Sequence, residues 1–99
     1  MPPHDVDDPE RTFKKRFADL VEASGLSIRD IEKRTPVGRS TIDGWRRGKA
    51  LPQDRGDLIK VVEVLRAAAA VAGTRDTWGT AEWAALLSRA KEARMSRPS

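Results

Sequence analysis

The sequence predicts an all-α fold, a compact bundle of about five helices. Three observations support this prediction. Apolar residues recur at helical spacing in five segments, capping residues and glycine or proline bound those segments, and no segment has the alternation of a strand. The chain of 99 residues is 38% hydrophobic and 34% charged, which suits one small domain. We expect a disordered acidic leader at residues 1–9, a helical domain at 10–93 and a flexible tail at 94–99.

The first helix is expected to begin near Pro9, because proline is favoured at the first helical position. Phe13, Phe17 and Leu20 follow at spacings of three and four, which places them on one face. Gly25 is expected to end the helix, since glycine readily adopts the left-handed conformation that closes helices.

A second, short helix is expected after Ser27. Asp30 lies three residues further on, so the pair resembles a capping box with aspartate in place of glutamate. Ile31 supplies the core-facing side chain. Thr35-Pro36 is expected to stop this helix, because the residue before proline avoids the helical conformation.

A third helix is expected from about Arg39 to Arg47, closed by Gly48. Ile42 and Trp45 are three residues apart and therefore share one face. The turn before this helix contributes a further apolar side chain to the core.

A fourth helix is expected to begin at Asp54 or Asp57 and to end at Gly73. A fifth helix, for which Thr80 is the expected cap, carries Trp83 on its apolar face. The predicted core comprises Phe13, Phe17, Leu20, Ile31, Val37, Ile42, Trp45, Leu58, Val62 and Leu65.

The charge is distributed unevenly along the chain. Residues 1–10 carry four acidic and no basic side chains, whereas residues 11–60 carry thirteen basic and seven acidic ones. The whole chain carries a net charge of +4. A basic segment of this kind favours polyanionic partners, nucleic acid first. The basic side chains at positions 14–16 are interpreted as a solvated helix face.

The residue content excludes several classes of function. The sequence has no cysteine and one histidine, His4, so it lacks catalytic sets and metal sites built from these residues. We expect no enzyme activity, no metal and no cofactor. The leader lacks the pattern of a signal peptide, and no apolar run reaches the ~20 residues of a membrane span. We therefore expect a cytoplasmic protein without a membrane partner.

The most informative segment is LSIRDIEKRTPVGRSTIDGWRRGKALP, at residues 26–52. A short capped helix, a tight turn and a second short helix describe a helix-turn-helix. Core side chains from both helices leave one face of the second helix uncovered. A short protruding helix fits the major groove of DNA, which is wide enough to admit one.

This segment resembles the helix-turn-helix domains of the phage-repressor type (XRE/Cro-like), in particular those of actinobacteria. The resemblance rests on the pattern Arg-Ser-Thr-Ile-x-x-Trp-x-x-Gly-x-x-Leu-Pro at residues 39–52, and it covers residues 11–72. Residues 73–95 are similar to the tryptophan-bearing last helix of the actinobacterial members. The resemblance implies a five-helix bundle that binds double-stranded DNA, as a transcriptional regulator or as the DNA-targeting module of a larger protein.

On this interpretation, the helix at residues 39–47 is the recognition helix that contacts DNA. We expect base contacts from Arg39, Ser40 and Asp43, because arginine matches the acceptors of guanine and aspartate accepts from cytosine. An alternative role for Asp43 is to balance the charge of Arg39 or Arg47. The residues expected to contact phosphate are Arg29, Lys33, Arg46, Arg47 and Lys49. Because one such domain buries little DNA, tight specific binding needs a second copy or a fused or partner domain.

Four positions depart from the family pattern. Gly38 replaces the serine that usually caps the recognition helix, and Glu32 replaces a small residue in the preceding helix. Ile28 stands where a polar residue often touches phosphate, and Gly44 stands where a side chain commonly contacts a base. Trp78 and Trp83 are expected to pack on the fourth helix. Gly44, Ile28 and the weak cap at Gly38 favour a second hypothesis, in which the fold serves as a protein–protein interaction module and these tryptophans form its contact surface instead.

Overall fold

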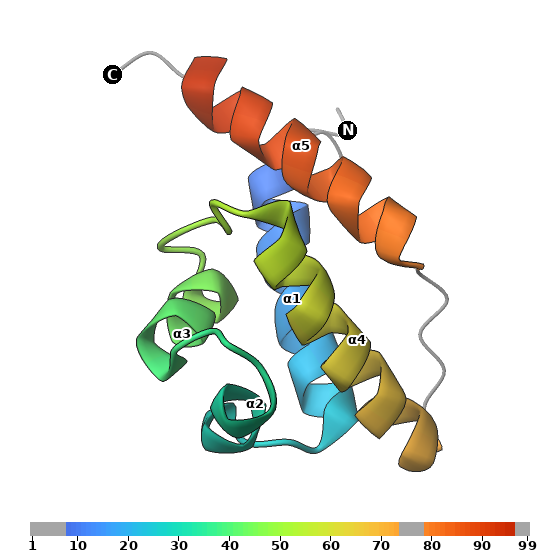
Figure 1. Ribbon diagram of the computed structural model, residues 1–99. Helices are drawn as coiled ribbons and strands as arrows, with labels where there is room; N and C mark the ends of the chain where they lie inside the picture. Colours follow the sequence, from blue (N-terminus) through green and yellow to red (C-terminus); the bar gives the residue numbers. More distant parts are fainter. Residues whose placement is uncertain (1–7, 74–78, 97–99) are drawn as a thin grey trace.

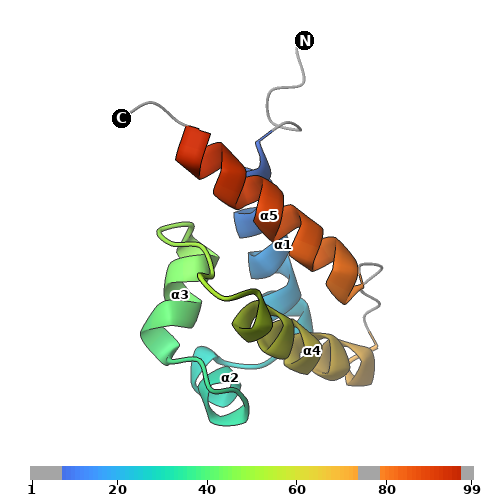
Figure 2. The same ribbon diagram turned by 45° about the horizontal axis from the view of Figure 1, so that its top comes forward.

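The computed structural model describes residues 8–73 and 79–96, and within these ranges it contains five helices and no strand. In chain order the helices are α1 (Pro9–Ser24), α2 (Ile28–Arg34), α3 (Arg39–Arg47), α4 (Arg55–Val71) and α5 (Thr80–Ser96). Figure 1 shows α2 and α3 on one side of the pair formed by α1 and α4, and Figure 2 shows α5 lying across that pair. The all-α bundle predicted from the sequence is confirmed.

Helix α1 is capped at both ends. Asp8 precedes it with an extended backbone, and the Asp8 carboxylate accepts a hydrogen bond from Arg11 N at 3.2 Å. Pro9 stands in the first turn, and Gly25 ends the helix at a φ of 71°, where an L side chain would be strained. Asp8 and Pro9, the last two residues of the expected leader, therefore belong to the helical domain.

The capping box predicted for α2 is present. Asp30 N donates to Ser27 Oγ at 3.1 Å, and Ser27 N donates to Asp30 Oδ2 at 3.2 Å. Thr35 ends α2 in an extended conformation, and Gly48 closes α3 at a φ of 77°. Two short helices joined by a tight turn have the arrangement of a helix-turn-helix.

Helix α4 begins after Asp54. Of the two aspartates predicted to start this helix, Asp54 is the one that caps it. The Asp54 carboxylate accepts a hydrogen bond from Gly56 N at 2.8 Å. The last helical residue is Val71, and Gly73 follows with a φ of 87°.

The cap predicted for α5, Thr80, is wrong. Thr80 is the first helical residue, and the carbonyl of Gly79 accepts from Trp83 N at 3.3 Å. Gly79 therefore occupies the capping position, which glycine tolerates well because it has no side chain to strain the turn. The helix continues to Ser96, into the segment expected to be a flexible tail. In the described part of the chain, no helix has the length and apolar content needed to cross a membrane.

The core joins side chains from all five helices, and all ten residues predicted to form it are buried. Phe17 of α1 meets Trp45 of α3 with ring centroids 5.8 Å apart, and Phe13 meets Trp83 of α5 at 5.9 Å. Trp83 is 1% exposed, so it packs in the core and offers no contact surface. Trp78, the other tryptophan considered for such a surface, lies outside the described residues.

Candidate nucleic-acid interface

Helix α3 turns one face to the core and the opposite face to solvent. Ile42 and Trp45 are 0% and 2% exposed. At about 100° per residue, Ser40 and Arg47 lie on the side opposite to them, with Asp43 beside them. Ser40 and Arg47 are exposed and Asp43 is partly buried. The middle of the open face of α3 is thus polar and carries both signs of charge.

Arg39 lies in the first turn of α3, at the edge of this open face. Its side chain is exposed, and within the described ranges its guanidinium makes no hydrogen bond or ion pair. The guanidinium keeps all of its donors for a partner outside the chain. This residue therefore fits the role of base contact that the sequence predicts.

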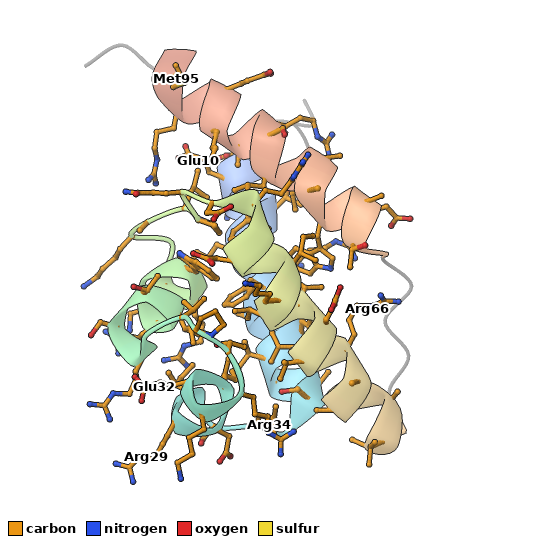
Figure 3. All side chains as sticks on the ribbon, viewed as in Figure 1. Glu10, Arg29, Glu32, Arg34, Arg66 and Met95 are labelled. Atoms are coloured by element: carbon orange, nitrogen blue, oxygen red, sulfur yellow. The ribbon has the colours of Figure 1, made fainter. Side chains whose placement is uncertain are left out.

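The N-terminus of α3 is capped by a residue of α2. Gly38, at the capping position, has no side chain to accept a hydrogen bond. Glu32 Oε2 instead accepts from Arg39 N at 2.8 Å, and Figure 3 shows Glu32 between α2 and the start of α3. Glu32 therefore supplies an acceptor to the first N–H of α3, where Gly38 has no side chain to cap the helix.

Asp43 holds the two arginines at the other end of α3. Arg46 Nη2 lies 2.7 Å from Asp43 Oδ1, and Arg47 Nε lies 2.9 Å from Asp43 Oδ2. The hydrogen bond from Arg46, together with the charge of both arginines, lowers the pKa of the Asp43 carboxyl below its ordinary value of 3.8. The predicted pairing with Arg47 is confirmed, but the second partner is Arg46 and not Arg39. Both carboxylate oxygens are engaged within the protein.

The remaining residues expected to contact phosphate are exposed and lie at two places around α3. Arg29 and Lys33 are four residues apart on α2 and share its solvent face. Figure 3 shows Arg29 projecting away from the body of the domain. Lys49 follows Gly48, directly after α3. Basic side chains therefore lie both on α2 and at the C-terminal end of α3.

Lys14 of α1 joins the basic end of α3, which the sequence analysis did not predict. A Cβ atom at Gly48 would lie 2.8 Å from Lys14 Cδ, so the Lys14 side chain lies against the backbone that closes α3. An open groove at this place is lined by Lys14, Ala18, Val21, Glu22, Gly25, Leu26, Arg46 and Arg47. No local pattern indicates this contact, because it joins two helices that are distant in sequence.

Packing explains one of the two other departures from the phage-repressor pattern, Ile28, but not the other, Gly44. Ile28 is partly buried and packs against the core, which accounts for an apolar residue at that position. A Cβ atom at Gly44 would lie 3.8 Å from Ala50 Cβ, an ordinary contact, so packing does not require glycine there. The Gly44 carbonyl accepts from Lys49 N at 2.9 Å and from Ala50 N at 3.3 Å, and it thereby helps to close the helix.

No protein-family model, no curated protein and no solved structure matches this chain.

Proposed function

We propose that this domain binds double-stranded DNA through α3, as a transcriptional regulator or as the DNA-targeting module of a larger cytoplasmic protein. The observation that carries the proposal is the open face of α3, with the exposed guanidinium of Arg39 in its first turn. A helix that enters the major groove N-terminus first presents this turn to the base edges. Arginine in that position matches the two acceptors of guanine.

The basic residues at the other end of α3 fit phosphate contacts. Arg46 and Arg47 share the single negative charge of Asp43, so the three side chains together keep a positive charge. Lys49 and Lys14 add to it. Arg29 and Lys33 on α2 supply a second group of cations. We assign Asp43 to holding Arg46 and Arg47 in place, because both of its oxygens already accept from them.

The hypothesis of a protein-interaction module has less support. It rests on the weak cap of α3 at Gly38, on Gly44 at a base-contacting position, on an apolar Ile28 at a phosphate-contacting position and on exposed tryptophans. Glu32 supplies the acceptor at the start of α3, and Ile28 packs against the core. Trp83 is buried. These three observations remove part of the support for a protein partner, whereas Gly44, where packing does not require glycine, still supports it.

Binding to a fluorescent duplex of random sequence, followed as salt is raised from about 50 mM, tests the proposal. We expect affinity to fall linearly on a log–log plot, with a slope of roughly −0.9 for each phosphate that the protein neutralises. Arg39→Ala should cost roughly 1–3 kcal/mol on a duplex selected for tight binding and little on random duplex. A wild-type protein that binds no duplex even at the lowest salt contradicts the proposal and favours a protein partner.

A further inference from the structure

Glu32 caps α3, and its carboxylate also places a negative charge at the N-terminus of that helix. The first turn of a helix has free N–H groups and a partial positive charge, which together attract phosphate. In α3, the free N–H of Arg39 is taken by Glu32 Oε2 at 2.8 Å. The capping carboxylate comes from α2 and is exposed to solvent. A full negative charge therefore stands at the end of α3 that would otherwise attract a DNA phosphate.

Phosphate contacts position a protein on DNA but do not distinguish one sequence from another. A serine at position 38 would also cap α3, through the N–H of Ser40 or Thr41, and leave no charge there, because a hydroxyl is neutral. The carboxylate at this place repels phosphate, while the exposed Arg39 guanidinium belongs to the same turn. This arrangement disfavours backbone contacts at the start of α3 and leaves base contacts to Arg39.

We propose that Glu32 is a specificity-determining residue of duplex binding, which lowers affinity for random duplex by holding a negative charge at the N-terminus of α3. This inference rests on the proposed function. It differs from a purely structural role, in which Glu32 would do no more than complete the cap of α3.

Two variants separate the cap from the charge. Glu32→Gln keeps a carbonyl oxygen that accepts from Arg39 N but removes the charge. The double variant E32A/G38S moves the cap to position 38. Serine fits there, because no atom of the described residues lies within 4 Å of a Cβ built on Gly38 and the backbone is extended, with φ −72° and ψ 155°. Glu92→Gln is the control, since it removes one exposed carboxylate from α5, which does not pack against α3 in the described ranges.

We expect Glu32→Gln and E32A/G38S to melt close to the wild-type temperature and to bind random duplex about two- to fivefold more tightly at low salt. Their preference for a selected duplex over random duplex should fall, and Glu92→Gln should change both quantities much less. If wild-type protein binds duplex and the two variants bind both duplexes as it does, Glu32 is only a cap and the inference is wrong. A wild-type protein that binds no duplex overturns the proposed function and this inference with it.

Discussion

Two glycines in and after α3 differ in whether the structure requires glycine. Gly48 has a φ of 77°, and the Lys14 side chain lies against it, so both its backbone conformation and its neighbour disfavour a side chain. Gly44 has a helical backbone, and a Cβ there would make only an ordinary contact with Ala50. Glycine at position 44 therefore weakens the helix without a gain in packing.

Gly44→Ala is expected to stabilise the domain by about 0.5–1 kcal/mol, because glycine in a helix interior loses more backbone entropy on folding than alanine. Thermal or urea denaturation measures the change. Gly48→Ala is the matched control and should destabilise the domain. If Gly44→Ala also destabilises it, the contact with Ala50 is tighter than an ordinary one.

Asp30 gives a prediction for the dependence of stability on pH. Hydrogen bonds from the Ser27 backbone N–H and then from the Ser27 hydroxyl lower the pKa of the Asp30 carboxyl below its ordinary value of 3.8. A group with a lowered folded pKa stabilises the fold above its unfolded pKa, and this stabilisation is lost as the pH falls through the folded pKa.

Wild-type protein should therefore melt at a higher temperature than Asp30→Ala near neutral pH, and the two melting temperatures should converge as the pH falls below 3.8. Asp19→Ala serves as the control, because the structure gives Asp19 no hydrogen bond or ion pair within the described ranges. A difference for Asp30→Ala that is the same at pH 7 and at acid pH would show that the charge of Asp30 does not stabilise α2.

At the scale of elements, helix ends were predicted correctly where the residues that form the end lie within one turn of each other. Ser27 with Asp30 and the glycines at positions 25 and 48 act on residues within one turn, so their positions in the sequence suffice. The cap on α3 was not predicted, because Glu32 reaches it from another helix. The missed contact of Lys14 with the end of α3 has the same cause.

The cap of α5 was predicted at Thr80 but lies at Gly79, and the reason for this error is a different one. Threonine is a common cap, but a backbone carbonyl begins a helix whatever the side chain, and here the carbonyl of Gly79 does so. The pairing within α3 was predicted in part. Asp43 has arginines at spacings of three and four, which are both neighbours on a helix surface, and it pairs with both.

The position of Lys14 at the end of α3 predicts a role in binding duplex DNA. Lys14→Ala should make the log–log salt slope shallower by about 0.9, the value expected when one phosphate is no longer neutralised. Lys15→Ala is a matched control, because Lys15 is the adjacent lysine on the same helix and does not line the groove beside Arg46. Equal slopes for the two variants would contradict a DNA contact at Lys14.

At the scale of the whole molecule, α5 is part of the single core. Trp83 packs on Phe13 and Phe17 of α1, and Phe17 in turn packs on Trp45 of α3. Polar contacts between described residues also tie α5 to other parts of the chain: Arg94 Nε lies 2.7 Å from Glu10 Oε1, and Lys91 Nζ donates to the Gln53 carbonyl at 2.8 Å. Helical spacing predicted which positions along the helices lie in the core. It did not predict which helix each core side chain packs against.

Trp83→Ala should destabilise the domain by about 3–5 kcal/mol, because it removes a fully buried aromatic side chain. A domain of this size has a total stability of only about 5–15 kcal/mol, so amide exchange in α3 should speed up together with exchange in α5. Hydrogen exchange measures both at once. Faster exchange confined to α5, with α3 unchanged, would show that α5 unfolds separately from α3.

The central claim is that the open face of α3 binds double-stranded DNA, and mapping of backbone amide shifts by NMR tests it most directly. A short duplex is added to labelled protein at low salt. We expect the shifted amides to lie in α3, in α2 around Arg29 and around Lys49, while those of α5 and of the end of α4 stay in place. Shifts confined to α4 and α5, or no shifts at all, would contradict the claim.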